Sequence, residues 1–228
     1  MTRPAVVLLS GGLDSATCLA WARREGFAAH ALTVDYGQRH AVEVLRAAVV
    51  ARELGAASHR IVAIDLSFLA GSALTDRNVA VPKARSREAI GSGVPPTYVP
   101  ARNTVLLALA LAWSESLGAR DLVIGVNAVD YSGYPDCRLA FLRAFEALAG
   151  CGTKAGAAGE RWRIHAPLVE LSKAEIVRRA VAWSVPFGST ISCYDPAASG
   201  APCGACDACV IRARGFREAG VEDLAADR

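Results

Sequence analysis

Short apolar runs alternate along the chain with segments whose apolar residues recur at a helical spacing. The apolar runs are typical of parallel strands, because such strands are buried on both faces. The expected strands are residues 5–10, 29–34, 60–64, 122–126 and 164–167. The expected helices are residues 14–25, 38–54, 103–117, 139–149 and 173–183. Gly26, Gly55 and Gly118 stand where the C-terminal caps of three of these helices are expected.

This order of elements predicts the fold class. Strands that alternate with helices build a parallel sheet with helices on both faces. We therefore expect an α/β fold, a doubly wound parallel sheet of about five strands. In such sheets the ligand binds beyond the carboxyl ends of the strands, where the winding reverses. The segments directly after the strands are thus expected to carry the chemistry.

The segment after the first strand reads Ser-Gly-Gly-Leu-Asp-Ser and opens a helix. Free N–H groups and the helix dipole attract phosphate there, and glycine lets the backbone approach an anion closely. Serine hydroxyls can donate hydrogen bonds, and Asp14 can hold Mg²⁺ against the phosphates. A plain turn of small residues is the alternative, but the strand before it favours a nucleotide site. The expected ATP-binding residues are Leu9, Ser10, Gly11, Gly12, Leu13, Asp14, Ser15, Ala16, Thr17, Cys18 and Leu19.

Arginine 102 precedes the most apolar helix of the chain. Asn103 or Thr104 can cap that helix, whereas Arg102 has no such local duty. We therefore expect Arg102 to bind an anionic group, either phosphate or carboxylate, with a solvated surface arginine as the alternative.

The loop after the fourth expected strand carries two tyrosines and two aspartates. With the usual winding it faces the Ser10–Ser15 turn, where it can sandwich and hydrogen-bond a planar heterocycle. The expected substrate-binding residues are Arg102, Asn103, Asn127, Asp130, Tyr131, Gly133 and Asp136.

Lysine 173 follows Ser172, which with Glu175 forms the capping box of a helix. The helix dipole disfavours a cation in the first turn, so a lysine at this position is expected where a bound anion offsets that unfavourable interaction. We interpret it as a phosphate-neutralising residue, against the alternative of a solvated lysine. The expected catalytic residues are Asp14, Ser15 and Lys173.

Two further segments are less specific. Residues 35–40 can form a wall for adenosine or a second substrate, and His40 is either a base or a structural histidine. Residues 150–160 are rich in glycine and are either a flexible lid over the site or a surface loop.

Four cysteines near the end of the sequence have the spacing of a metal site. Thiolates in a C-x-x-C-x-x-C run with a fourth cysteine ten positions earlier suit tetrahedral, structural Zn²⁺. An iron–sulfur cluster is the competing assignment. Arg212 and Arg214 can offset the negative charge of the thiolates. The expected ligands are Cys193, Cys203, Cys206 and Cys209, while Cys18, Cys137 and Cys151 are expected to be buried or incidental thiols.

Composition narrows the class of protein. The chain has 228 residues, 53% hydrophobic and 21% charged, which is typical of a globular domain. A net charge of +3 does not indicate a dedicated nucleic-acid binder. No stretch resembles a signal peptide, and the longest apolar run, residues 105–113, is half a membrane span. We expect a cytoplasmic protein with no membrane association and no stable nucleic-acid partner.

Together these motifs resemble the QueC family of the N-type ATP pyrophosphatases, or PP-loop enzymes. The resemblance covers residues 6–214 and rests on residues 10–15, 35–40, 98–103, 125–137 and 171–176 and the four cysteines. It implies an adenine-nucleotide α-hydrolase fold, with a PP-loop domain at residues 1–189 and a zinc-binding segment at residues 190–228. It also implies zinc on the four cysteines.

The resemblance further implies a reaction in which 7-carboxy-7-deazaguanine, ammonia and ATP give 7-cyano-7-deazaguanine, on the route to queuosine. The scheme runs through adenylated intermediates. The chain has no segment of the size of a glutaminase, so ammonia is expected to come from solution or from a partner protein, with free ammonia as the predicted donor. A homodimer is the expected assembly. Two alternatives remain: a PP-loop enzyme that thiolates tRNA, and a non-catalytic zinc module that binds nucleotides or nucleic acid.

Overall fold

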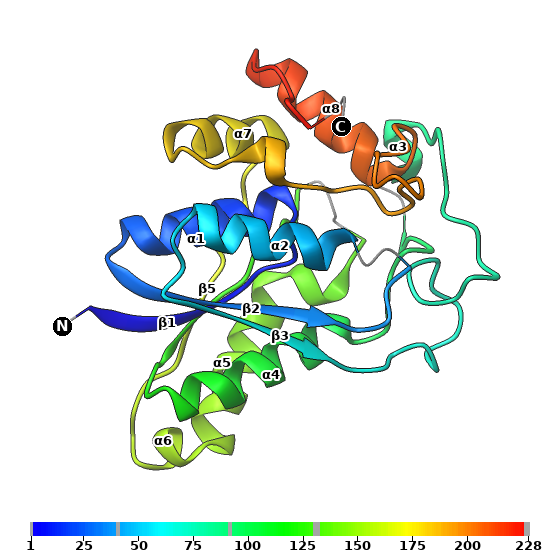
Figure 1. Ribbon diagram of the computed structural model, residues 1–228. Coiled ribbons are helices and arrows are strands. Elements are labelled where there is room, and N and C mark those ends of the chain that lie inside the picture. The colour runs from blue at the N-terminus through cyan, green and yellow to red at the C-terminus, as the bar shows by residue number, and fades with distance from the viewer. Residues whose placement is uncertain (1, 40–41, 91–92, 130–132, 226–228) are drawn as a thin grey trace.

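A computed structural model describes residues 2–39, 42–90, 93–129 and 133–225 of the chain (Figure 1). The strands are β1 Arg3–Leu8, β2 Phe27–Asp35, β3 Ser58–Ala63, β4 Asp121–Val123 and β5 Arg163–His165. The α-helices are α1 Leu13–Arg24, α2 Val42–Glu53, α3 Arg87–Ile90, α4 Arg102–Ser116, α5 Leu139–Gly152, α6 Lys154–Ala157, α7 Lys173–Ala182 and α8 Asp207–Ala219. Two short 3₁₀ helices are η1 Pro135–Cys137 and η2 Phe187–Ser189.

The five strands form one parallel sheet in the order β3-β2-β1-β4-β5. Val7 of β1 pairs with Ala31 of β2 on one side and with Val123 of β4 on the other. The winding therefore reverses beside β1, so the crevice expected in a doubly wound fold lies at its carboxyl end. This confirms the predicted fold class and number of strands.

Helices cover both faces of the sheet because alternate residues of β1 are buried on opposite sides. Ala5 and Val7 pack into a core with apolar residues of α1, α2, α7 and α8. Val6 and Leu8 pack into a second core with residues of α4 and α5. Figure 1 shows the two helical layers above and below the strands.

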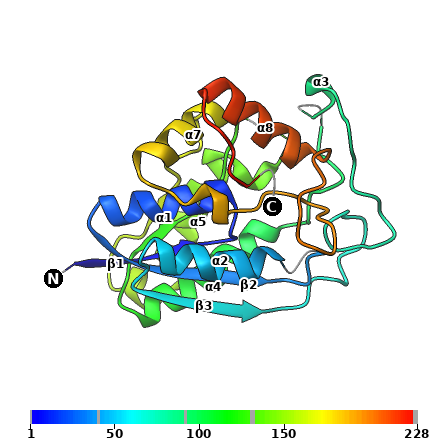
Figure 2. The same cartoon turned by 45° about the horizontal axis from the view of Figure 1, so that its top comes forward.

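The long irregular segment before α4 lies against the cysteine-containing segment. The Ala84 N–H donates to the carbonyl oxygen of Ala205 at 2.8 Å, and Arg85 forms an ion pair with Asp207 at 2.9 Å. Ala73 and Val81 pack with the buried cysteines in a third apolar cluster. Both views place α8 beside α7 (Figure 2). The boundary at residue 190 stays a prediction.

The lid hypothesis for residues 150–160 is wrong. Helix α5 continues to Gly152, and the Thr153 hydroxyl then caps α6 by accepting from the Gly156 N–H at 3.0 Å. Arg120, directly before β4, holds Glu160 at 2.8 Å. This helical corner therefore lies at the amino ends of β4 and β5, away from the expected crevice.

The cap expected for α4 is also wrong. The helix begins at Arg102, so Asn103 lies within its first turn and neither it nor Thr104 is the N-cap residue. The Asp136 carboxylate supplies the cap instead, because its Oδ2 accepts from the Asn103 N–H at 3.1 Å. Over the described ranges, none of the helices has both the length and the apolar character that a membrane crossing requires.

Candidate functional site

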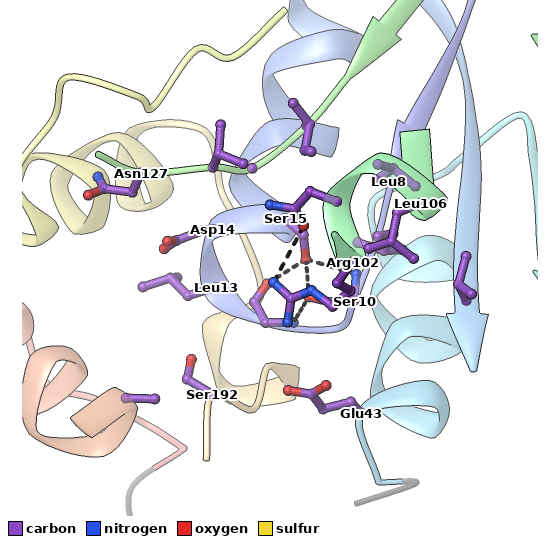
Figure 3. A pocket seen from close by; sticks show the side chains of 18 of the residues that line it. Leu8, Ser10, Leu13, Asp14, Ser15, Glu43, Arg102, Leu106, Asn127 and Ser192 are labelled. Carbon is purple, nitrogen blue, oxygen red and sulfur yellow. Dashed lines mark hydrogen bonds between the residues drawn. The ribbon is translucent and has the colours of Figure 1, made fainter. Parts of the chain in front are cut away.

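A cavity of about 240 Å³ opens at the carboxyl ends of β1, β2 and β4 (Figure 3). Its wall combines the turn before α1, the start of α4, the loop after β4, the first residue of α7 and the segment before the cysteines. Apolar side chains such as Leu32, Leu106 and Ile124 line part of it, while serines, Asp14, Lys173 and Arg102 line the rest. Segments far apart in the sequence therefore meet at the winding reversal.

Hydrogen bonds of two serines, Ser10 and Ser15, fix the shape of the turn before α1. Their hydroxyl oxygens are 3.1 Å apart, and the Ser15 hydroxyl donates to the Gly12 carbonyl oxygen at 3.0 Å. The Ser15 Oγ accepts from the Ser10 N–H at 3.1 Å. Gly12 is the N-cap residue, and no side chain caps α1. The first-turn N–H groups are therefore left to bind an anion.

Two glycines allow this close packing. Gly11 has a φ of +87°, and a Cβ there would lie 2.5 Å from the Glu43 carbonyl oxygen of α2. At the end of β4, a Cβ on Gly125 would lie 3.1 Å from the backbone nitrogen of Ser15. Both positions bring neighbouring backbone against the turn and fix its shape.

Lysine 173 reaches the turn from α7. Its Nζ donates to both carboxylate oxygens of Asp14, at 2.8 and 2.7 Å, across 159 positions of sequence. The Lys173 side chain is only 7% exposed and that of Asp14 19%. The capping box of Ser172 and Glu175 that starts α7 is present as predicted. The pairing places a cation at the turn before α1.

Arginine 102 lies among three tyrosines. Its guanidinium carbon is 5.9 Å from the centre of the Tyr36 ring, and its Nε is buried without a hydrogen-bond partner among the described residues. Burial lowers the pKa of Arg102, but the oxygens of Tyr36, Tyr134 and Tyr194 outweigh it and raise that pKa. Burial raises the pKa of Tyr36 and Tyr134, so both stay neutral and can donate hydrogen bonds.

The four cysteines expected to bind metal are brought together. Their Sγ atoms all lie within 4.8 Å of one another. Backbone N–H groups donate to the sulfurs, including those of Asp195 and Cys203 to Cys193 at 3.3 and 3.2 Å. Hydrogen bonds from the Cys193 and Cys209 thiols lower the pKa of Cys206. A donor set of four sulfurs with N–H support can hold a metal ion.

The family profile described as "Queuosine biosynthesis protein QueC" matches residues 4–220. The chain belongs to the QueC family. A 7-cyano-7-deazaguanine synthase from Anaeromyxobacter sp. (strain Fw109-5) is 64% identical over 222 residues, 97% of this chain and 95% of the relative. The synthase of that name from Thiobacillus denitrificans is 59% identical over 96% of each chain. The predicted resemblance is confirmed.

Solved structures of other enzymes share the fold of this QueC chain. An NMN synthetase from Francisella tularensis matches with a TM-score of 0.50 and 20% identity, over 99% of this chain and 76% of the other. A 4-thiouridine synthetase, solved as an RNA complex with bound ATP, matches with a TM-score of 0.50 and 18% identity, over 96% and 50%. At these identities the likeness extends to the fold alone, and the QueC match decides among the three hypotheses for function.

The ATP-binding residues predicted for this QueC chain divide into two groups. Leu9, Ser10, Gly12, Leu13, Asp14 and Ser15 line the cavity. Gly11 packs against α2, whereas Ala16, Thr17, Cys18 and Leu19 are fully buried residues of α1. The second group therefore supports the turn from behind.

The predicted substrate residues also divide. Arg102, Asn103 and Asn127 line the cavity. The Asn127 Nδ2 donates to the carbonyl oxygens of Leu168 and Leu171, at 3.1 and 2.6 Å, which ties the β4 loop to the start of α7. Three further predicted residues, Asp130, Tyr131 and His40, lie outside the described residues.

Two other predicted substrate residues have packing roles in the QueC structure. Asp136 caps α4 from behind Asn103 and is not part of the cavity lining. A Cβ on Gly133 would overlap the Gly93 carbonyl oxygen, so glycine lets two loops touch. Substrate contact by either residue stays a prediction.

Sequence reasoning missed Tyr194 and Glu43, both of which line the cavity. Tyr194 directly follows a cysteine, so its position indicated only the metal segment. The Arg212 guanidinium pairs with Asp223 at 2.6 and 2.8 Å. Compensation of the thiolate charge by Arg212 and Arg214 stays a prediction. Lys83 lies close enough to the cysteines to interact with them electrostatically. Its pKa is raised, first by Asp195 and to a lesser extent by Cys203 and Cys193.

Cysteine 137 is the thiol in the cavity of the QueC chain. Its Sγ accepts from the Asn103 Nδ2 at 3.6 Å. Burial raises its pKa to about 11, so it is a neutral thiol at physiological pH. A protonated thiol is a poor nucleophile, which argues against sulfur transfer through this residue.

Proposed function

We propose that the chain converts 7-carboxy-7-deazaguanine, ammonia and ATP into 7-cyano-7-deazaguanine, AMP and pyrophosphate. The observation that carries the proposal is the cavity itself. It joins the phosphate-binding turn and Lys173 to a buried arginine within reach of tyrosine hydroxyls, in a chain of the QueC family. An adenylating enzyme needs a site that binds the ATP phosphates and a separate cation that binds the carboxylate of the substrate.

The ATP phosphates are assigned to the turn at Ser10–Ser15. The free N–H groups of α1 and the serine hydroxyls would hold the leaving pyrophosphate, and Lys173 would neutralise its charge. Asp14 lines the cavity with a carboxylate, a ligand that suits Mg²⁺. Mg²⁺ held there would supply further neutralisation of the phosphate oxygens.

The substrate carboxylate is assigned to Arg102. A guanidinium with an unpartnered Nε retains a directed donor for an oxyanion, and burial strengthens that interaction. The surrounding tyrosine rings and hydroxyls suit a flat heterocycle with polar edges. Asn103 lies beside Arg102 and lines the same wall.

The chemistry follows from the poor reactivity of a carboxylate towards ammonia. A carboxylate oxygen attacks the α-phosphorus of ATP, the bridging P–O bond breaks, and pyrophosphate leaves. Ammonia attacks the acyl carbon and loses a proton as AMP departs, which gives the amide. The amide oxygen then attacks a second ATP with loss of pyrophosphate and a proton. Cleavage of the C–O bond expels AMP and the last N–H proton, leaving the nitrile. The protein contributes positioning and charge neutralisation.

The metal of the cysteine cluster is assigned as zinc. Four thiolates about 2.3 Å from a tetrahedral Zn²⁺ lie about 3.8 Å apart, which fits the observed 4.8 Å limit. All four positions would be filled by protein, so the site is structural. One zinc per chain by elemental analysis and a colourless protein test the assignment, and visible absorption with bound iron would overturn it.

Assembly, nitrogen source and location complete the proposal. We assign free ammonia as the nitrogen donor, a homodimer as the assembly, and the cytoplasm as the compartment. Residues 1–189 are the proposed PP-loop domain and residues 190–228 its zinc-binding segment. Sedimentation velocity tests the dimer, and replacement of ammonium by glutamine tests the nitrogen source.

One reaction tests the central proposal. Purified protein is incubated with ATP, Mg²⁺, ammonium and 7-carboxy-7-deazaguanine, and the products are identified by mass. The nitrile and AMP are expected. If neither forms while the protein is folded and contains zinc, the proposed activity is wrong. Asp14→Asn is expected to abolish AMP release and to leave the fold and zinc content intact.

A further inference from the structure

Helix α8 connects the cysteine cluster to the ATP site. Cys206 is its N-cap residue and Cys209 lies in its first turn, so the cluster fixes where the helix begins. Gly215 follows nine positions after Cys206, about 14 Å along the helix axis. This glycine lies against α7, the helix that carries Lys173.

Glycine 215 makes the decisive contact. A Cβ at this position would overlap Cγ of Lys173 and would lie 2.9 Å from its Cβ and 3.2 Å from its carbonyl carbon. Glycine is a poor helix former, yet it stands in the interior of a 13-residue helix. The contact explains its presence, because only a residue without a side chain lets the Lys173 stem lie flat on α8.

The rest of α8 is fixed on both sides of this contact. Arg212, one turn before Gly215, donates to Thr190, to the Phe187 carbonyl oxygen and to both carboxylate oxygens of Asp223. Phe216, directly after Gly215, is 2% exposed and packs in the core beneath α7. The helix therefore has little freedom to move away from the lysine.

We infer that α8 positions Lys173 for the reaction and that Gly215 is the positioning residue through which an ordered cysteine cluster acts on the ATP site. The stem of Lys173 is confined between α7 and Gly215, which leaves its Nζ directed at Asp14. The inference rests on the proposed role of Lys173 in nucleotide binding. It does not depend on the identity of the deazaguanine substrate.

The test combines nucleotide affinity with a direct signal from the lysine. The chain contains three lysines, Lys83, Lys154 and Lys173, so protein labelled with ¹⁵N-lysine gives few side-chain signals. Gly215→Ala is expected to shift or broaden the Lys173 Nζ signal and to weaken MgATP binding at least tenfold by calorimetry, with one zinc per chain retained. Gly150→Ala is the matched control, since a Cβ there meets nothing within 4 Å.

A double variant separates positioning from general loosening. Lys173→Met keeps the stem and removes the ammonium group, so adding Gly215→Ala to it should weaken MgATP binding by less than twofold. An equal loss in both backgrounds would overturn the inference, as would an unchanged Lys173 signal in Gly215→Ala.

A second arm needs no variant. Removal of the metal from wild-type protein by a chelator, with far-UV circular dichroism as the check on folding, should move the Lys173 signal and leave that of Lys154 in place. A Lys173 signal that stays fixed in folded, metal-free protein contradicts the link between cluster and lysine. Because neither arm uses the deazaguanine, a missing nitrile product and a failed positioning role are told apart.

Discussion

Replacement of Lys173 by methionine removes one charge from the proposed phosphate site and leaves the packing of the side-chain stem in place. Methionine retains the Cβ and Cγ that pack on Gly215, so the contact between α7 and α8 should persist. What is lost is an ammonium group 2.7 and 2.8 Å from the two oxygens of Asp14. Asp14 would then lack the Lys173 ammonium beside the proposed ATP phosphates.

The size of the effect follows from the burial of the pair. Two unit charges 4 Å apart interact by about 4 kcal/mol at an effective dielectric constant of about 20. Lys173 is 7% exposed, so solvent screens it weakly, while the 19% exposure of Asp14 admits some water. A loss of about 2–4 kcal/mol corresponds to a decrease of about 30- to 1,000-fold in kcat/KM for ATP.

The assay should isolate the first chemical step. Exchange of labelled pyrophosphate into ATP, dependent on 7-carboxy-7-deazaguanine, reports adenylation without the later steps. Lys154→Met is the control, because Lys154 lies in α6 at the other end of the sheet. Exchange by Lys173→Met within threefold of wild type would refute a neutralising role. An equal loss in Lys154→Met would mean that the assay reports general damage.

Three other predictions concern separate parts of the chain. Arg102→Lys should raise KM for the deazaguanine about tenfold and leave KM for ATP unchanged in steady-state kinetics, because lysine lacks the planar donor fork. Gly11→Ala should destabilise the fold by about 2 kcal/mol or more in urea unfolding, and by more than Gly26→Ala, which has a similar φ but open space around it. Burial lowers the pKa of His30 and His59. Their contribution to stability is therefore complete above the unfolded pKa of about 6.5 and decreases as the pH falls below it. Urea unfolding at pH 7.5 and 5.5 should show this loss, and a variant that lacks both histidines should show less of it.

The fold was predictable where burial alone decides the structure. The apolar runs at residues 5–10 and 29–34 predicted strands covered on both faces, and the observed strands β1 and β2 differ from them by two residues or fewer at each end. Helix α8 was not predicted, because the cysteines at its start have the spacing of a metal site and mask the helical pattern that follows. The error at residues 150–160 has a similar origin. Glycine content indicated mobility, whereas the Thr153 cap and the buried Ala155 hold a helical turn.

The site was predictable where local sequence and topology agree. The turn at Ser10–Ser15 follows a buried strand, and Lys173 stands against its own helix dipole, so the place of both at the cavity could be predicted from the sequence. Tyr194 carries no such local conflict. Tyr194 lines the same cavity as Arg102 because of the path that the segment before α8 takes, and no short stretch of sequence determines that path.

The packing of α8 against Lys173 gives the four-cysteine cluster a possible function at a site that it does not touch. A phosphate-binding turn needs only backbone and two serines, but a lysine on a flexible stem loses its advantage unless the stem is confined. Helix α7 carries the lysine, and its own backbone leaves one face of the Lys173 stem to be covered by α8 at Gly215. Helix α8 covers that face, and its start depends on four cysteines that a metal can hold. Under the proposed positioning role, the four cysteines near the end of the sequence would determine how rigidly Lys173 is held beside the proposed ATP phosphates.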